Sequence, residues 1–181
     1  NDEKRYFEIE TVYTKTLGEI KDLINSFKDS RKTLLIPEVG SGFERALYAT
    51  YLSYLSTDSF SYELKGHKDD RGTFYEMLKT NNSGQVSIST TAVGAARGGH
   101  YHNTKNEKFL VLKGMATIRL RNILSEEIIE YKVTCKKMEV VEMIPGYTHN
   151  ITNTGDDELV LLVWANENFD RENPDTFFLQ V

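Results

Sequence analysis

Three of the four histidines stand in an arrangement that suits a metal ion. His100 and His102 are two positions apart, and on a β-strand positions i and i+2 project to the same face, so both imidazoles can reach one ion. Glu107 opens the next apolar run, and His149 comes from a distant segment behind Pro145-Gly146. Three imidazole nitrogens and one carboxylate oxygen suit Zn, Fe, Mn, Ni or Cu and leave room for water or a substrate. The pattern therefore predicts a metal site, against the alternative that these are ordinary surface or core histidines.

These four residues need strands to hold them, and the chain from about residue 58 onward has the pattern of strands. Short runs rich in Val, Ile, Thr, Tyr and Phe alternate with turn-forming residues such as Asn81-Asn82-Ser83-Gly84 and Lys113-Gly114. Many short strands at even spacing indicate a sandwich or a barrel. The expected strands are Thr73–Leu78, Gln85–Thr91, Glu107–Leu112, Ala116–Arg121, Glu127–Val133, Met138–Met143 and Leu159–Trp164.

The first part of the chain, residues 1–57, predicts helices instead. Thr16-Leu17-Gly18-Glu19 has the spacing of a capping box, and apolar residues follow at helical intervals as far as Phe27. Ser41-Gly42-Phe43-Glu44 repeats that spacing ahead of a second apolar face, which extends to Leu55. Neither helix can bury its apolar face alone, so we expect the segment to pack on the rest of the chain, on a partner or on a further domain.

Composition narrows the class of protein. The 181 residues allow one core with a helical appendage, and a net charge of -5 provides no basic surface for nucleic acid. No apolar stretch approaches the roughly 20 residues that a membrane helix needs, so we expect no membrane partner. The single cysteine, Cys135, cannot form an internal disulfide, which fits a cytoplasmic protein. The chain begins at Asn1 without methionine or a signal peptide, from which we expect a piece of something longer.

The two histidine blocks resemble the two signature motifs of the cupin superfamily, in which a small double-sheet barrel holds a metal in its mouth. The first block fits at every signature position, from Gly94 to Gly114. The second block, Pro145 to Asn153, departs in one respect, because family members usually have one residue between the proline and the glycine. The resemblance implies a mainly β fold, a cupin (double-stranded β-helix, a jelly-roll-like barrel), with a short α-helical N-terminal segment. It implies four metal ligands: His100, His102, Glu107 and His149. A metal with a purely structural role is an open alternative.

A narrower resemblance is to the deoxysugar nucleotide epimerases, cupin enzymes that invert carbon centres beside a 4-keto group. Asp69 to Glu76 is similar to their D-x-R-G-x-F-x-E segment, and Arg97-Gly98-Gly99-His100-Tyr101 is similar to their R-G-x-H-[YF] segment. In that family arginines bind the nucleotide diphosphate, partly across a dimer interface, and a planar guanidinium suits phosphate oxygens. The resemblance implies a substrate-binding role for Arg71, Arg97, Phe74 and Glu76.

The same family uses a histidine as its base, which conflicts with the metal site. A histidine nitrogen that is bound to a metal cannot also take a proton from carbon, so His100 cannot easily be both ligand and base. We expect a Lewis-acidic metal to stabilise the enolate near the carbonyl oxygen instead. The proton shuttle then falls to another side chain, and the catalytic candidates, in falling order, are Lys108, Tyr147, His67 and Tyr101.

The whole chain resembles the C-terminal half of the bifunctional capsular polysaccharide enzymes, which join a short-chain dehydrogenase (reductase) domain to a cupin. This implies that residues 1–57 end a truncated reductase domain and that residues 58–181 form the cupin domain, within a homodimer made through the cupin. It implies metal-dependent C-3 epimerisation of a UDP-4-keto-2-acetamido-2,6-dideoxyhexose on the route to N-acetyl-L-fucosamine, with zinc as the expected metal. NADPH would bind only to the missing reductase domain, because Arg45 and Pro37 spoil the dinucleotide-binding turn that Val39 to Glu44 resembles.

Two other classes of function fit the same motifs. An oxygen-using cupin such as a dioxygenase has the same ligand set but needs redox-active iron or copper. A sugar-binding or dimerising module would keep the fold without the chemistry. Metal content and oxygen consumption distinguish the dioxygenase from an epimerase, and solvent deuterium exchange into a UDP-4-keto sugar distinguishes the binding module.

Overall fold

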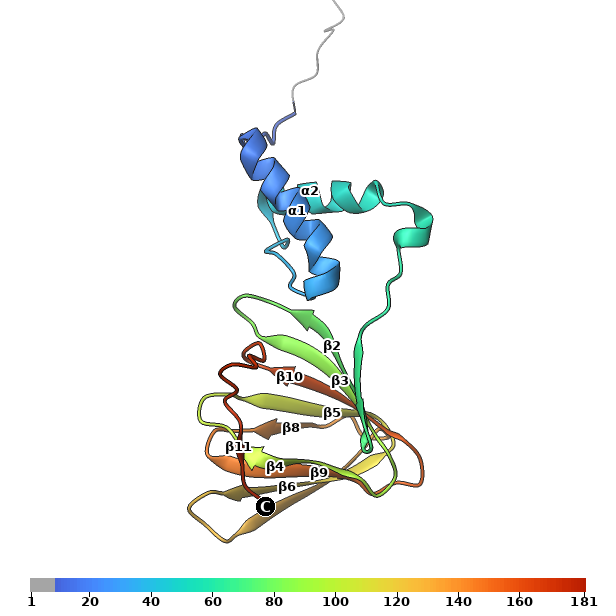
Figure 1. Ribbon diagram of the computed structural model, residues 1–181, viewed down its shortest axis with the longest axis vertical. Coiled ribbons are helices and arrows are strands. Elements are labelled where there is room, and N and C mark those ends of the chain that lie inside the picture. Colours follow the sequence, from blue (N-terminus) through green and yellow to red (C-terminus); the bar gives the residue numbers. More distant parts are fainter. Residues whose placement is uncertain (1–8) are drawn as a thin grey trace, which may run out of the picture.

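The computed structural model describes residues 9–181, in which two helices and a 3-10 turn precede eleven strands (Figure 1). The helical elements are α1 (Leu17–Thr33), α2 (Gly42–Ser53) and the 3-10 turn η1 (Thr57–Ser59). The strands are β1 (Gly66–Asp69), β2 (Gly72–Lys79), β3 (Gln85–Thr91), β4 (Ala96–Tyr101), β5 (Glu107–Lys113), β6 (Met115–Asn122), β7 (Ile128–Thr134), β8 (Val140–Met143), β9 (Tyr147–Asn153), β10 (Leu159–Ala165) and β11 (Phe177–Phe178). The helices lie to one side of a body built from the strands.

The strands form two antiparallel sheets that enclose one core. One sheet has the order β1-β2-β3-β10-β5-β8, and the other has the order β11-β4-β9-β6-β7. Along β10 every second residue is buried, as expected for a strand with one face toward the interior. The apolar core comes from both sheets: Phe109, Val111, Ala116, Ile118, Leu120, Val133, Val141, Met143, Ile151, Leu159, Leu161 and Val163. The prediction of a mainly β, double-sheet barrel is therefore confirmed.

Each strand predicted from the residue pattern is present, and the differences lie at the ends. The run predicted from Met138 becomes a strand only at Val140, because Lys137 bridges back to Thr134 and closes a turn first. The residue pattern did not delimit four strands: β1, whose residues are all exposed, β11, which has only two residues, and β4 and β9, which carry His100 and His149 but contain few apolar residues. Apolar alternation needs a longer half-buried strand to be visible in a sequence.

One of the two predicted helix caps is correct. The Thr16 hydroxyl accepts a hydrogen bond from the Glu19 N–H at 3.2 Å, and the Glu19 carboxylate accepts one from the Thr16 N–H at 2.8 Å. The equivalent cap at Ser41 is wrong, since its side chain makes no capping hydrogen bond. Gly42 follows at a φ of +66°, outside helical geometry, and Glu44 lies 3.5 Å from Lys15 instead.

The two helices pack on each other around Phe27, which is fully buried. Its ring lies 5.0 Å from that of Tyr48, measured between centroids. The segment between the helices bonds to Lys79 at the end of β2. The Lys79 N–H donates to the Leu34 carbonyl at 2.7 Å, and the Ile36 N–H donates to the Lys79 carbonyl at 2.8 Å. These bonds join the helical segment to the end of β2. None of the helices in residues 9–181 combines the length and the apolar character needed to cross a membrane.

The last residues, 174–181, form what we call the C-terminal strap. In Figure 1 it runs beside β4, where β11 pairs with Tyr101 and His100. The Leu179 N–H donates to the Gly99 carbonyl at 3.0 Å, and Arg121 donates to the Gln180 carbonyl at 2.7 Å. The strap is therefore fixed along the strand that carries the first predicted ligand.

Candidate metal centre

The four predicted ligands are brought together from both sheets. His100 on β4 pairs directly with His149 on β9. Gly98 permits this close approach, because its φ is +98° and a Cβ there would lie 2.5 Å from the His149 carbonyl oxygen. His102 follows the end of β4, and Glu107 is the first residue of β5 in the opposite sheet. The ligand set therefore bridges the two sheets.

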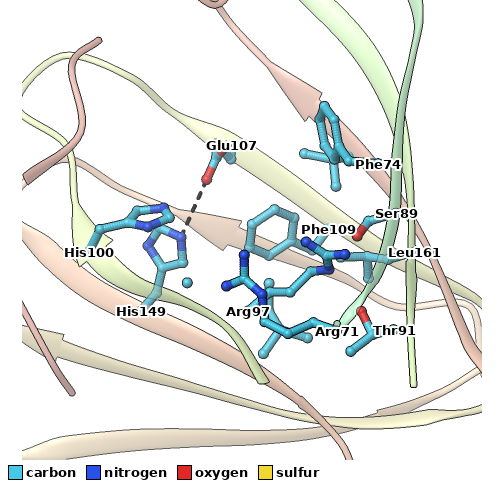
Figure 2. A pocket seen from close by; sticks show the side chains of 13 residues that line it. Arg71, Phe74, Ser89, Thr91, Arg97, His100, Glu107, Phe109, His149 and Leu161 are labelled. Carbon is cyan, nitrogen blue, oxygen red and sulfur yellow. Dashed lines mark ion pairs between the residues drawn. The ribbon is translucent and has the colours of Figure 1, made fainter. Parts of the chain in front are cut away.

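The geometry of the four side chains matches that of a metal site. One candidate ligand atom from each residue lies within 4.8 Å of the others. The Glu107 Oε2 lies 3.4 Å from the Nε2 atoms of both His102 and His149, and Figure 2 shows His100 and His149 below that carboxylate. Ligand atoms about 2.1 Å from a tetrahedral zinc ion stand roughly 3.4 Å apart. The two distances from Glu107 are thus compatible with ligands of one metal ion.

The hydrogen bonding of His102 also fits a metal. Its Nδ1 contacts the carbonyl oxygen of Asp175, to which the neutral ring donates, and this leaves the lone pair on Nε2. Among the residues that the structure describes, the buried His102 Nε2 and Glu107 Oε2 have no hydrogen-bond partner. Two buried acceptor atoms facing each other are unfavourable unless a cation lies between them. The donor set therefore fits a divalent ion.

The protonation states agree with this assignment. Burial, together with the other two histidines, lowers the pKa of His100 to about 4. Burial also lowers the pKa of His149, against the charge of Glu107. Burial acts in the same direction on His102, but Glu107 and the Asp175 carbonyl outweigh it and raise the pKa. Burial alone would raise the pKa of Glu107, but the three neighbouring histidines, His102 above all, lower it. The lowered pKa values keep His100 and His149 neutral and Glu107 ionised, as metal ligands must be, whereas His102 has to release its proton when an ion binds.

Two cavities reach the four ligands. One has a volume of about 280 Å³ and the other of about 680 Å³. They share four wall residues: Arg71, Phe74, His100 and Glu107. Figure 2 shows the smaller cavity, with His100 and Glu107 on one side and the arginines and Phe74 on the other. A molecule bound in either cavity can therefore contact the metal site.

Comparison with protein families matches residues 67–177 to the polysaccharide biosynthesis C-terminal domain. The chain belongs to this family. It is 53% identical, over 174 residues, to the UDP-2-acetamido-2,6-beta-L-arabino-hexul-4-ose reductase of Pseudomonas aeruginosa, and the match covers 96% of this chain and 47% of that protein. The predicted resemblance to capsular polysaccharide enzymes is thereby confirmed.

Solved structures of similar proteins support the same family and fold. The capsular polysaccharide assembling protein CapF from Staphylococcus aureus is 50% identical and superimposes with a TM-score of 0.92 over 95% of this chain and 47% of that one. This chain thus spans about half the length of both relatives. An oxalate decarboxylase from Lactobacillus farciminis, 19% identical with a TM-score of 0.51 over 64% of this chain and 33% of that one, shares the barrel fold alone. The predicted cupin fold is confirmed.

The predicted substrate-binding residues of this family member line the cavities. Arg71 and Arg97 both contact Asp69, at 2.6 and 3.3 Å, and Figure 2 shows both guanidinium groups directed into the smaller cavity. The hydrogen bond from Arg71 is the main reason that the pKa of Asp69 falls to about 2. Phe74 lines both cavities, and Glu76 lines the larger one.

The four candidates for the proton shuttle are placed differently. His67 lines the larger cavity. Lys108 does not, because β5 turns Glu107 inward and therefore Lys108 outward, where it pairs with Glu142. Tyr101 stacks on Phe177 of the C-terminal strap, 5.2 Å between centroids, and is not among the residues lining either cavity. Tyr147 packs against the apolar core.

Two residues at the site have no signal in the sequence pattern. Lys105 lies in the loop before β5, is only 5% exposed and lines the larger cavity. Asp175 lies 70 residues further along the chain, and its carboxylate accepts hydrogen bonds from the backbone N–H groups of Asn103, Thr104 and Lys105. A lysine or an aspartate in a loop resembles any surface residue until its long-range contacts are known.

Proposed function

We propose that this chain is the epimerase part of a bifunctional nucleotide-sugar enzyme. It would catalyse metal-dependent C-3 epimerisation of a UDP-4-keto-2-acetamido-2,6-dideoxyhexose in capsular polysaccharide biosynthesis, on the route to N-acetyl-L-fucosamine. The observation that carries this proposal is the convergence of three imidazoles and one carboxylate on cavities that also contain two arginines. The family membership and the sugar named for the Pseudomonas relative support the substrate class.

The reaction needs a proton to leave C-3 and to return on the opposite face. The C3–H bond breaks, its electron pair forms a C3=C4 double bond, and the carbonyl electrons move onto the oxygen as an enolate. A divalent ion supplies Lewis acidity that stabilises this negative charge. Among the four candidates, His67 is the group that we propose to remove the C-3 proton, because it lines the larger cavity beside His100 and His102. A proton from solvent water that enters the cavity would add to C-3 on the opposite face, and the enolate would return to the ketone.

The arginines bind the diphosphate in this proposal. Arg71 in the turn between β1 and β2 and Arg97 on β4 reach one cavity and are held by the same carboxylate, Asp69. Two guanidinium groups fixed in this way suit the several oxygens of a diphosphate. Phe74 and Glu76 contact the sugar or the base from the wall of the larger cavity.

Zinc is the metal that we propose, since three imidazoles and one carboxylate at these spacings suit a tetrahedral ion without redox chemistry. We further propose that residues 1–57 belong with a reductase domain that uses NADPH, that residues 58–181 are the cupin domain, and that the enzyme forms a homodimer through the cupin. The relatives are about twice as long as this chain, which leaves room for such a reductase domain.

NMR of solvent deuterium exchange into the UDP-4-keto sugar tests the proposal. The chain should incorporate deuterium at C-3, and His149→Ala should abolish that exchange while its circular dichroism keeps the β signal. Lys113→Gln is the matched control, because Lys113 lies on β5 but is half exposed and pairs with Asp157 at 2.9 Å. No exchange with the unaltered, zinc-loaded chain would contradict the epimerase assignment. Oxygen consumption by the iron-loaded chain would favour a dioxygenase instead.

A further inference from the structure

Lys105 has an almost completely covered side chain, and its charge forms only a loose ion pair within the protein. Its side chain is 6% exposed, and the nearest carboxylate oxygen, on Glu167, lies 3.7 Å from Nζ, beyond hydrogen-bond distance. Among the described residues Nζ makes no side-chain hydrogen bond, yet it does not belong to the fully buried unpaired atoms, so the ammonium group keeps contact with the larger cavity. The ring of Phe169 lies 5.7 Å from the ammonium group. An ammonium group has three donors, so Nζ can accept a further partner from the cavity.

The position of Lys105 shows where such a partner would lie. The residue lines the larger cavity together with three of the metal ligands, His100, His102 and Glu107. Its backbone N–H donates to Asp175 at 2.8 Å, so the loop that carries it is fixed. Burial is the main cause of the lowered pKa of His100, and the charge of Lys105 contributes in the same direction. The ammonium group therefore faces the metal site across a shared cavity.

A divalent ion held by these ligands would repel the charge on Lys105 across the cavity. A negatively charged oxygen between them removes that repulsion and gives Lys105 a further acceptor. The other positively charged side chains that line the larger cavity either pair with carboxylates or are exposed. Lys79 pairs with Glu76 at 3.0 Å, Arg71 pairs with Asp69, and Arg171 is exposed.

We propose that Lys105 binds the substrate oxygen that becomes negatively charged in the reaction, on the side of that oxygen away from the metal ligands. This inference rests on the proposed function and names a second group for the same site. As the C3–H bond breaks and its electron pair forms the C3=C4 double bond, the charge collects on the former carbonyl oxygen. Lys105 donates a hydrogen bond to that oxygen and keeps its own proton.

The first test uses anion binding and needs no catalysis. Cobalt(II) is loaded into the chain, and oxalate is titrated while the visible spectrum of the metal is recorded. Loss of one charge-assisted hydrogen bond corresponds to a weakening of roughly tenfold or more, which is expected for Lys105→Gln and Lys105→Met. Lys105→Arg, which keeps the charge, should stay closer to the unaltered chain. Neutral imidazole should bind all of these chains with similar affinity.

Controls separate this role from a structural one. Lys113→Gln removes an exposed lysine from β5 and should leave the oxalate affinity unchanged. Circular dichroism and the cobalt affinity of each Lys105 variant report whether the loop and the ligands stay in place. If Lys105→Gln disturbs them, Lys105→Met and Lys105→Arg still provide the comparison of neutral with charged side chains. Equal oxalate affinity in the charged and neutral variants would overturn the inference.

The second test measures C-3 deuterium exchange with the UDP-4-keto sugar. Lys105→Gln should lower the maximal exchange rate by roughly tenfold or more while the Michaelis constant changes little, because the contact strengthens as charge develops. A rise in the Michaelis constant alone would place Lys105 on the diphosphate and contradict the inference. If the unaltered chain shows no exchange but Lys105 still governs oxalate binding, the proposed function fails while the anion site stands.

Discussion

The barrel and the helical segment differ in how much of their structure they bury. In the barrel, residues such as Ile118 and Leu159 are fully buried within a core drawn from both sheets. In the helices, Phe27 is the only buried apolar residue, and Leu17 is 87% exposed. The barrel thus has its own core and its own site, whereas the helices have only the small cluster around Phe27 to stabilise them. The barrel should accordingly unfold as a unit, with the helices contributing little.

The largest expected effect comes from opening the barrel core. Ile118→Ala should lower the free energy of unfolding by about 2–5 kcal/mol, because it leaves a cavity between the sheets. Phe27→Ala should reduce the helical signal in circular dichroism but leave the unfolding midpoint of the β signal nearly unchanged. Urea denaturation, followed by circular dichroism of the helical signal and of the β signal, provides the measurement. Equal losses in the two variants would show that helices and barrel form a single cooperative unit.

The next effect concerns the strap that supports the metal ligands. Asp175→Ala should weaken zinc affinity about 10- to 100-fold, because it frees the loop that carries His102 and Lys105. Asp170→Ala is the control, since that carboxylate accepts hydrogen bonds only within its own loop, such as one from the Glu172 N–H at 2.9 Å. Competition with a chromophoric chelator measures both affinities. Unchanged zinc affinity in Asp175→Ala would show that the C-terminal strap does not support the metal ligands.

Acidification should weaken metal binding mainly through protonation of His102. The raised pKa of His102 means that a proton competes with the metal already near neutral pH, whereas His100, with a pKa of about 4, competes only in acid. Metal binding near neutral pH should therefore release no more than about one proton, and that proton should come from His102. Calorimetry in buffers of different ionisation enthalpy counts it. Release of about three protons would contradict the assigned protonation states.

The smallest effect tests the helical side of the comparison. Thr16→Ala removes the hydroxyl of the observed capping box and should cost about 1 kcal/mol of helix stability. Ser41→Ala is the matched control, because the Ser41 side chain makes no capping hydrogen bond, and it should cost less. Helical ellipticity during thermal unfolding measures the difference. An equal loss in both variants would mean that the cap at Thr16 does not stabilise α1.

Much of the fold and the core of the candidate site are predictable because they depend on local patterns. Period-two alternation indicates strands such as β3, and the spacing of His100 and His102 indicates a shared face. The outward position of Lys108 follows from the same alternation once Glu107 is a ligand. The prediction that ranked Lys108 first among the proton shuttles did not take this alternation into account. Lys105 and Asp175 depend on contacts between distant segments, for which a single sequence carries no periodic signal.

The central claim is that three imidazoles and one carboxylate converge on a single ion. X-ray absorption spectroscopy of the zinc-loaded chain tests it most directly. We predict a shell of nitrogen and oxygen neighbours at about 2.0–2.1 Å with the multiple-scattering pattern of three imidazoles. In His149→Ala the multiple-scattering pattern should correspond to two imidazoles. A shell made only of water and carboxylate oxygens, or one that contains the sulfur of Cys135, would contradict the account.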